Sequence, residues 1–334
     1  MHSQIEDYLK GKSLLITGAS GYLASNLANS LKKIPCKIRQ LTRKNKLTSL
    51  KWNAAFEKIQ GEISERTLWD RTIEGVDIIF HFAGQTSVYA AEKDPAIDYE
   101  ANVLPMLHML EACKKNKTRP DILFAGTSTQ MGLPKSLPVN ETCLDKPITI
   151  YDTHKCMAEN YLKYYARMGF VRGTTLRLTN VYGPGPKSSS KDRGILNAMI
   201  RRALSGENLT LYGDGKYIRD YIYIEDVLSA FLLASINMAS LNEKHFVLGS
   251  GQGHSISEVL HQIAKQAALK TGKHIEIESI DPPPGLSPIE ERYFIANSKT
   301  FSKITGWQPR YSLSKGIDQT LEKFSLQDSF LHFT

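Results

Sequence analysis

The sequence predicts an α/β fold with a doubly wound parallel sheet and a smaller α+β lobe that binds the substrate. In the first half, short apolar runs alternate with amphipathic stretches at the spacing of βαβ units. A glycine-rich turn, TGASGYLA at 17–24, joins the first apolar run to the first helical stretch. The 334 residues exceed one typical domain, so we expect one large α/β unit or two fused lobes.

The elements of the main sheet follow from the pattern of apolar residues. The run VDIIFHFA at 76–83 is apolar almost throughout, as is typical of a strand buried on both faces. We expect further strands at Ser13–Thr17, Lys37–Thr42, Phe56–Gln60, Asp121–Ala125 and Thr175–Leu178. We expect helices at Tyr22–Lys33, Ala96–Lys115 and Tyr151–Met168.

The character of the chain changes after Leu178. The segment YGPGPKSSSKDR at 182–193 is rich in Gly, Pro and Ser, which is typical of a loop that leaves the sheet. We expect a helix at Ile195–Ser205, a further segment at Thr210–Asp220, a late sheet strand at His245–Ser250 and an amphipathic helix at Leu313–Phe324. The dinucleotide-binding domain is therefore predicted at 1–180, completed by about 221–251. The substrate-binding lobe, built from insertions and the C-terminal part, is predicted at 181–220 and 252–334.

Composition and charge exclude several classes of partner. The net charge is +8, yet the basic clusters lack the recognition-helix or stacking-aromatic pattern of nucleic-acid-binding proteins. We interpret them as solvated faces and as groups that hold an anionic small ligand. No apolar run approaches the roughly 20 residues that span a bilayer, so we expect no membrane partner.

The cysteines and the amino end indicate a cytoplasmic protein. The four cysteines are scattered, with no CxxC pair, which favours reduced thiols over disulfides or a metal site. The first residues, MHSQIEDYLKGKS, include acidic side chains and lack the apolar core of a secretory signal. We expect a cytoplasmic location and no metal.

The glycine-rich turn predicts a site for a dinucleotide. Glycines allow the tight turn and let backbone N–H groups approach a pyrophosphate at the helix N-terminus, where the helix dipole favours anions. Glycines alone are weak evidence for a dinucleotide site. The position of this turn between a strand and a helix is what supports the prediction. The residues expected to contact the cofactor here are Gly18, Ser20, Gly21, Tyr22 and Leu23.

The end of the second strand bears on the choice between the two nicotinamide cofactors. An NAD site commonly carries an Asp or Glu there, whereas this chain has Thr42, Arg43 and Lys44. Because an arginine can bind a 2′-phosphate, these residues favour NADP, with NAD as the alternative cofactor. The other interpretation is that Arg43 and Lys44 are only solvated loop charges. Glu62 is a candidate to hydrogen-bond the adenine, and the alternative is that it is a surface carboxylate. The remaining expected cofactor contacts are Ile63, Ala83, Gly84, Asn102, Tyr151 and Lys155.

Tyr151 and Lys155 form a candidate proton-transfer pair. They stand at i and i+4, on one face of the long predicted helix. A free tyrosine has a pKa of about 10, and a lysine ammonium one turn away favours the phenolate. A hydroxyl about 24 residues upstream, at the end of a strand, can orient the reacting group; Thr127 fits, with Ser128 as the alternative.

These motifs together resemble the extended short-chain dehydrogenase/reductase family. TGASGYLA, HFAG, GTST and YDTHK are similar to its nucleotide-sugar epimerase/dehydratase branch, which includes UDP-glucose 4-epimerase-like enzymes. The resemblance covers about residues 12–324 and ends near Gly306–Pro309, similar to the family's GW-x-P segment. It implies a Rossmann fold, a nucleotide-diphosphate sugar as substrate, and a homodimer formed through Ala96–Lys115 and Tyr151–Met168.

The resemblance also implies a set of sugar-nucleotide contacts. Asn180 would meet the diphosphate, Arg219 and Arg292 would grip it, and Leu211 or Tyr212 would pack on the base. The full set of expected substrate-binding residues is Gln85, Thr86, Ser128, Thr129, Asn180, Arg193, Leu211, Tyr212, Arg219 and Arg292. Asp152 and His154 have no family role and are expected on the helix surface or the rim of the site.

The residues after Thr127 limit which of the family's reactions the sequence predicts. Family dehydratases carry an Asp-Glu pair there and decarboxylating relatives a Glu at the second position, whereas this chain has Ser128 and Thr129. A 4-epimerase is therefore the leading hypothesis, with Tyr151 as the base and hydride return to the opposite face. The alternatives are an NADPH-dependent reductase of a 4-keto sugar and a non-catalytic dinucleotide binder. Gln130 and Met131 replace the family's Val-Tyr, which leaves the floor of the sugar pocket open.

Overall fold

The computed structural model of the protein describes residues 2–43, 55–186 and 194–331, and its core is a seven-stranded parallel sheet. The strand order is β10-β6-β5-β4-β1-β2-β3. The order reverses between β1 and β4, which makes the carboxyl ends of these two strands the switch point where ligands bind in such sheets. The strands are β1 (Ser13–Thr17), β2 (Lys37–Thr42), β3 (Ala55–Gln60), β4 (Ile78–His81), β5 (Asp121–Thr127), β6 (Arg172–Leu178) and β10 (His245–Leu248). The predicted doubly wound α/β fold is confirmed.

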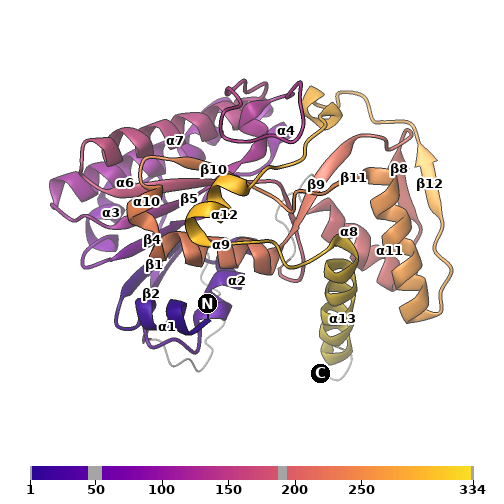
Figure 1. The fold of residues 1–334 in the computed structure, drawn as a ribbon, viewed down its shortest axis with the longest axis horizontal. Helices are drawn as coiled ribbons and strands as arrows, with labels where there is room; N and C mark the ends of the chain where they lie inside the picture. Colours follow the sequence, from indigo (N-terminus) through magenta and orange to yellow (C-terminus); the bar gives the residue numbers. More distant parts are fainter. Residues whose placement is uncertain (1, 44–54, 187–193, 332–334) are drawn as a thin grey trace.

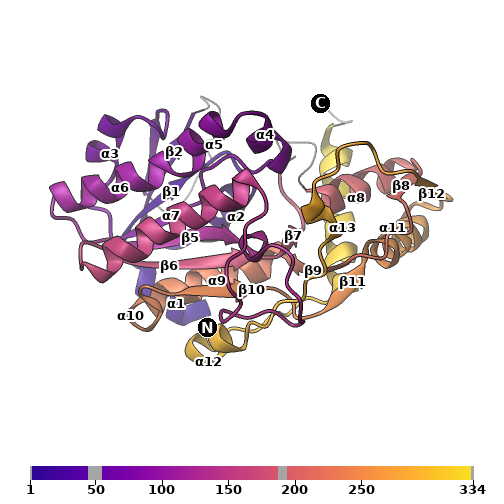
Figure 2. The same ribbon diagram turned by 90° about the horizontal axis from the view of Figure 1, so that it is seen from above.

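Helices cover both faces of this sheet (Figures 1 and 2). On β1, Leu14 and Ile16 belong to one buried apolar cluster and Leu15 to the other, as the alternation of side chains along a strand requires. One layer holds α3 (Arg66–Thr72), α5 (Pro95–Asn102), α6 (Leu104–Lys115) and α7 (Ile150–Arg167), with the short α4 (Val88–Lys93) beside them. The other holds α1 (His2–Leu9), α2 (Tyr22–Leu31), α9 (Ile224–Ile236) and α10 (Met238–Leu241).

The helix expected at Ala96–Lys115 is not continuous, and this prediction was wrong in detail. The chain forms α5 and α6 instead, with Val103 between them at φ −103° and ψ −54°. Pro105 explains the break, because its ring excludes the carbonyl four residues earlier and it has no N–H to donate. Pro105 is tolerated in the first turn of α6, where its missing donor costs nothing.

The second lobe stands to one side of the sheet, at the right of Figure 1. It contains α8 (Ile195–Ser205), α11 (Ile256–Thr271), α13 (Leu313–Leu331) and the parallel pair β8 (Leu209–Tyr212) and β12 (Ile277–Ile280). A small sheet of β7 (Asn180–Tyr182), β9 (Ile218–Tyr223) and β11 (Gly253–Ser255) lies between the lobe and the main sheet. The expected segment Thr210–Asp220 is thus two strands, separated by a turn in which Gly213 and Gly215 have positive φ.

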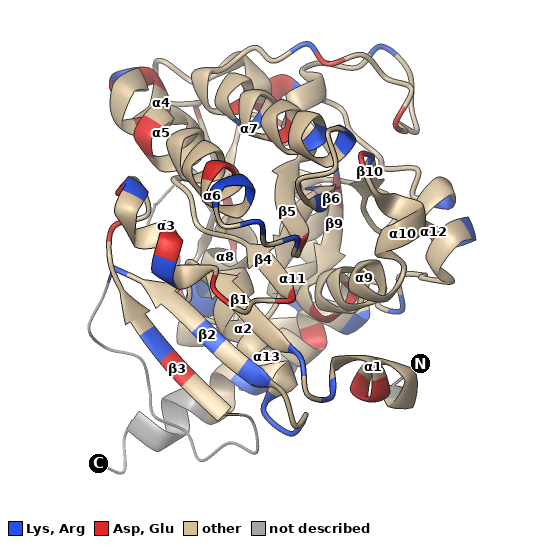
Figure 3. Cartoon of the chain, turned by 90° about the vertical axis from the view of Figure 1, so that its left-hand side faces the viewer, with Lys and Arg blue, Asp and Glu red and all other residues tan. Residues whose placement is uncertain are grey.

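Opposite charges are interspersed on the side of the molecule formed by β2, β3, α3 and α6 (Figure 3). Arg39 on β2, for example, lies 2.8 Å from Glu57 on β3. Three further short elements are the 3-10 turns η1 (Ser128–Met131) and η2 (Pro288–Glu291) and the helix α12 (Lys299–Thr305). Among the described helices, none combines the length and apolarity needed to cross a bilayer.

Candidate functional site

The glycine-rich turn lies at the switch point, and its backbone closely approaches the backbone that follows β4. Gly18 has φ +68°, and a Cβ on it would stand 2.9 Å from Cα and N of Ala83, at the end of β4. Thr17 Oγ1 accepts hydrogen bonds of 3.0 Å from the N–H groups of Phe82 and Ala83. Gly21 is the N-cap of α2, so no capping side chain covers the first N–H groups of the helix. These free donors fit a pyrophosphate.

The end of β2 brings Arg43 beside the carboxylate of Glu62, which follows β3. Arg43 Nη1 lies 4.0 Å from Glu62 Oε2, and 74% of the Arg43 side chain is exposed. Thr42 and Ile63 are buried, and the backbone oxygen of Ile63 accepts from the indole of Trp69. Lys44 falls outside the described residues. The structure therefore brings together Arg43 and Glu62, two of the residues expected around the adenosine.

Gly84, Gln85 and Asn102 meet around a carboxylate that sequence reasoning missed. Asp98 Oδ1 accepts from Gln85 Nε2 at 2.7 Å and from Asn102 Nδ2 at 2.9 Å. A Cβ on Gly84 would stand 2.5 Å from Asn102 Oδ1. Because Gln85 also bonds twice with Ser87, its amide is engaged within the protein.

Tyr151 and Lys155 lie one turn apart near the start of α7, and both are buried. Tyr151 packs in a small apolar cluster with Val88, Ala91 and Ile289, the last of which comes from the C-terminal part of the chain. Burial lowers the pKa of Lys155 from 10.5 to about 7, although the Asp98 and Glu159 carboxylates oppose this shift. Lys155 can thus exchange its proton near neutral pH.

The strand-end hydroxyls are held by two buried carboxylates. Thr127 Oγ1 lies 2.7 Å from Thr129 Oγ1, and Thr129 in turn donates to Asp152 Oδ1. Gln130 accepts from the Thr127 N–H at 3.0 Å and donates to Glu159 Oε2 at 3.0 Å. Gln130, at a position where the sequence departs from the family pattern, therefore anchors this turn to α7. Ser128 and Thr129 are both buried.

Asp152 and His154 are buried, so of the two expected positions the helix surface was wrong, and the rim of the site stays a prediction. Asp152 is fully buried, and His154 Nδ1 lies 2.7 Å from Asp98 Oδ2. Helix α7 packs against η1, α4 and α5. Of the three residues between Tyr151 and Lys155, only Thr153 is exposed.

Three of the expected diphosphate contacts converge at the small sheet beside the second lobe. Arg292 Nη2 donates to Asn180 Oδ1 at 3.2 Å, and Arg219 donates to the backbone oxygens of Glu290 and Arg292. Both arginines are buried, and burial lowers the pKa of Arg219. Leu211 is buried and Tyr212 is half exposed on the same strand. Arg193 falls outside the described residues.

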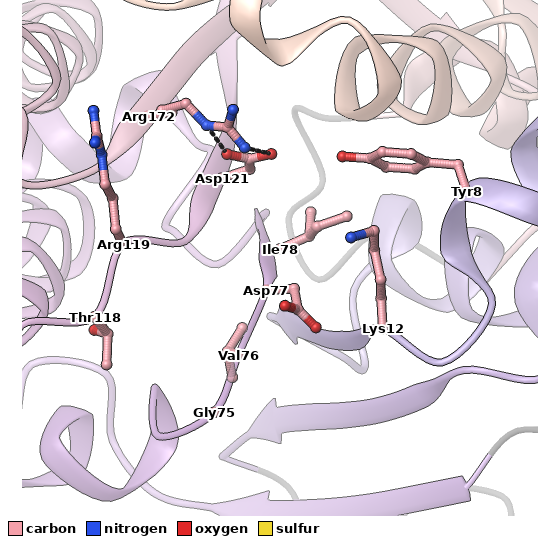
Figure 4. A pocket seen from close by; sticks show the side chains of 10 residues that line it. All are labelled: Tyr8, Lys12, Gly75, Val76, Asp77, Ile78, Thr118, Arg119, Asp121 and Arg172. Carbon is pink, nitrogen blue, oxygen red and sulfur yellow. Dashed lines mark hydrogen bonds and ion pairs between the residues drawn. The ribbon is translucent and has the colours of Figure 1, made fainter.

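A pocket of about 360 Å³ lies at the opposite edge of the sheet (Figure 4). It is lined at the amino ends of β4, β5 and β6, where Arg172 forms a fork on Asp121 at 2.6 and 2.9 Å. None of the predicted site residues is among the residues that line it. Elsewhere in the described part of the chain, no group of three or more His, Cys, Asp or Glu side chains could hold a metal ion.

Known proteins resemble this chain over most of its length. A model of the NAD dependent epimerase/dehydratase family matches residues 14–249. CDP-paratose 2-epimerase from Salmonella typhi is 28% identical, over 92% of this chain and 97% of its own length. UDP-glucose 4-epimerase from Thermotoga maritima, solved with UDP-glucose, superposes with a TM-score of 0.82 at 27% identity, over 94% of this chain and 99% of that one. The Thermus thermophilus UDP-glucose 4-epimerase, solved with NAD, gives 0.80 at 27% identity over the same shares.

Proposed function

The chain belongs to the NAD dependent epimerase/dehydratase family, and from that premise we propose that it is a nucleotide-sugar 4-epimerase. It is an enzyme of the extended short-chain dehydrogenase/reductase type that uses a nicotinamide cofactor. The observation that carries the proposal is the placement of Tyr151 and Lys155. They lie one turn apart on α7, beside the hydroxyls at the end of β5 and at the same edge of the sheet as the glycine turn.

The protein's residues divide the work of a proton transfer. Tyr151 takes the proton of the sugar hydroxyl, and the buried Lys155 favours the phenolate that does so. Thr127 contacts the same sugar oxygen and fixes its position. A nicotinamide cofactor held at the glycine turn would supply the reversible hydride transfer at the sugar carbon that inversion of this centre requires. The lack of a carboxyl group at Ser128 and Thr129 supports epimerisation over dehydration.

We further propose that the lobe of residues 181–220 and 252–334 holds the nucleotide diphosphate. Asn180, Arg219 and Arg292 lie together, and buried guanidinium groups bind phosphate oxygens with directed, charge-assisted hydrogen bonds. Tyr212 presents an exposed ring that suits stacking on a base. Gln85 and Thr86 would then border the sugar.

For the cofactor we propose a preference for NADP over NAD. Arg43 follows β2 with its guanidinium largely exposed, so it can bind a 2′-phosphate even though Glu62 lies 4.0 Å away. Titration of the purified protein with both cofactors tests this. Arg43→Gln should weaken NADP binding about tenfold, the loss of one bond to a charged group. NAD binding by the same variant is the control and should change little.

A reductase of a 4-keto sugar is the second candidate, and Arg43 is the observation that favours it. The deciding experiment mixes the protein with UDP-, dTDP-, GDP- and CDP-sugars without added cofactor and follows the products by NMR. Interconversion of C4 epimers without net redox supports the epimerase. A strict need for NADPH, consumed in proportion to product, supports the reductase. Inversion at C2 alone would overturn both.

We also propose a homodimer formed through the helices at 95–115 and α7. Large apolar side chains are exposed on these elements, including Ile97, Tyr164 and Met168. Exposed apolar groups on neighbouring helices are typical of an interface between subunits. Sedimentation of the wild-type protein and of Tyr164→Glu tests it, because a charge at the contact should shift a dimer toward monomer.

A further inference from the structure

The buried carboxylate of Asp98 on α5 is a point where three segments of the chain meet. Its Oδ1 accepts from Gln85 Nε2, in the loop after β4, at 2.7 Å and from Asn102 Nδ2, one turn later on α5, at 2.9 Å. Its Oδ2 lies 2.7 Å from Nδ1 of His154 on α7. Only 1% of Asp98 is exposed, so these bonds are shielded from water.

The direction of the two bonds to Oδ1 does not depend on whether Asp98 is ionised. An amide nitrogen can only donate. The backbone of Ser87 shows which atom of the Gln85 amide is the nitrogen, because the Ser87 N–H donates to Gln85 Oε1 and the Ser87 oxygen accepts from Gln85 Nε2 at 2.7 Å. The backbone oxygen of Gln85 likewise accepts from Asn102 Nδ2 at 3.1 Å. Asp98 is therefore the acceptor for both side chains in either protonation state.

The bond between Gln85 and Asp98 closes the segment that carries α4. The chain leaves Gln85, forms α4 and returns to α5, where Asp98 stands one turn after the N-cap Asp94. Both N–H groups of the Gln85 amide are used in this closure, one on Asp98 and one on Ser87, so neither remains to donate to a sugar. Gln85 therefore acts on the site through the loop that it holds.

Helix α4 depends on such support. It has six residues, and a helix this short is not stable by itself. Its N-cap is Ser87, the residue to which the Gln85 amide bonds. Val88 and Ala91 on α4 belong to the buried cluster that surrounds the ring of Tyr151. The loop that Asp98 holds therefore fixes one wall of the space that this ring occupies.

We propose that Asp98 is a positioning residue for Tyr151. Through Gln85 it holds α4 against the Tyr151 ring, and through His154 it holds the same support against α7, the helix that carries the ring. This inference rests on the proposed function for the role of Tyr151 in proton transfer. What the role requires of position 98 is a buried acceptor for two N–H donors, and not a charge.

Crystal structures of the wild type and of Asp98→Leu test this placement without any activity. The leucine side chain is similar in size and offers no acceptor, so the Gln85 amide should turn away to regain a partner. We expect α4 and the Tyr151 ring to shift with it by about 1 Å, a displacement large enough to slow a reaction. Gln85→Met serves the same test if Asp98→Leu does not fold. Unchanged positions of α4 and Tyr151 would overturn the proposal.

Kinetics of the variants test the consequence on whichever reaction the wild-type protein catalyses. Asp98→Leu and Gln85→Met should each lower kcat about tenfold to 100-fold, with KM for the nucleotide sugar changed less than about threefold. Their double variant should lose less than the product of the single losses, because both remove the same bond. A raised KM with unchanged kcat in Gln85→Met would instead indicate a direct sugar contact and overturn the inference. If no nucleotide sugar is turned over, the proposed function fails, and the crystal structures still decide whether Asp98 places the ring.

Asp98→Asn separates the acceptor from the charge. The asparagine oxygen can accept from both donors and its amide can donate to His154, so this variant should restore most of kcat. Each variant is measured at its own optimum pH, because Asp98 is also the leading group that raises the pKa of Lys155. If Asp98→Asn is as slow as Asp98→Leu there, the acceptor is not what matters and the inference is wrong.

Asp226→Leu is the matched control for a loss of stability alone. Asp226 is 0% exposed on α9, on the other face of the sheet, and accepts from the backbone N–H groups of Arg310 and Tyr311 at 3.0 and 3.1 Å. Its replacement should lower the melting temperature, as Asp98→Leu does, and leave kcat nearly unchanged. An equal loss of kcat in both variants would contradict a positioning role for Asp98.

Discussion

The ammonium of Lys155 lies 4.0 Å from the centroid of the Phe124 ring, so β5 also supplies an aromatic face to this buried lysine. A ring face attracts a cation, but it replaces only part of the hydration that burial removes. The pKa of Lys155 therefore falls to about 7. Near pH 7 the charged and neutral forms of Lys155 therefore have similar free energies, so the side chain can gain or lose a proton there.

The pH dependence of stability should report this burial. Between pH 7 and about 10.4 the unfolded chain keeps the Lys155 proton that the folded chain has lost. The free energy of unfolding should consequently rise with pH in that window. Lys155→Met removes the contribution of this titration. The free energy of unfolding of the wild type minus that of the variant should therefore increase from pH 7 to 10, as measured by urea titration of the cofactor-free protein. The exposed Lys216→Met is the control, and a flat difference for Lys155→Met would contradict the assigned burial.

Gly18→Ala should abolish cofactor binding and destabilise the fold. The new methyl group would stand 2.9 Å from the Ala83 backbone, in addition to the cost of about 1 kcal/mol for a left-handed residue. Gly11→Ala is a matched control, since Gly11 has φ +76° and nothing lies within 4 Å of its added Cβ. Calorimetric titration with both cofactors and thermal melting separate the two variants. Equal effects would mean that the close approach to β4 is unimportant.

Tyr151→Phe should lower kcat by about 10²- to 10⁴-fold, the usual contribution of a positioned acid or base. The ring remains to fill the cluster with Val88, Ala91 and Ile289, so the melting temperature should stay within a few degrees of wild type. Binding of the nucleotide sugar should persist. Full activity in this variant would rule out the proposed chemistry.

Arg292→Lys should raise KM for the nucleotide sugar about tenfold or more, because a lysine cannot reproduce a directed fork of donors. The variant also loses the bond from Arg292 to Asn180. Lys216→Gln removes an exposed cation from the same lobe and should leave KM nearly unchanged. Comparable effects of the two substitutions would favour a general electrostatic attraction over a specific contact.

Arg177→Met should destabilise the protein by about 3–5 kcal/mol, the range seen when one partner of a buried ion pair is removed. Arg177 is 0% exposed and bonds to Glu159 and Asp145 at 2.5–2.9 Å. The exposed pair of Arg167 and Glu243 offers the comparison, since Arg167→Ala should change stability by less than about 1 kcal/mol. Chemical denaturation measures both.

Sequence patterns predicted the elements whose causes are local. The glycine turn and the apolar runs of β1 and β4 depend on near neighbours, so the doubly wound parallel sheet could be predicted from them. The break between α5 and α6 could also have been predicted, because Pro105 stands in the middle of the expected helix. Helix α11 carried a usable pattern too, the capping box of Ser255 and Glu258.

The surroundings of the site depend on contacts between distant parts of the chain. Asp98 meets His154 across 56 residues and Thr129 meets Asp152 across 23, and both contacts exist only because α5, α7 and β5 pack together. The position of Asp152 after Tyr151 gave no sign of its burial, since helix periodicity does not say which neighbours cover a face. The same limit applies to Gln130, whose side chain meets Glu159 only in the folded protein.

The hydroxyl of Tyr22 donates to the backbone oxygen of Gly183 at 2.9 Å, and Asn26 donates to that of Pro184 at 3.2 Å. These two bonds connect α2, the helix that follows the glycine turn, to the segment that leads into the second lobe. A hinge motion that opened the lobe along this edge would have to break both, at about 0.5–1.5 kcal/mol each. The two bonds therefore make α2 and the segment after β7 one mechanical unit, which would couple the glycine turn to the second lobe.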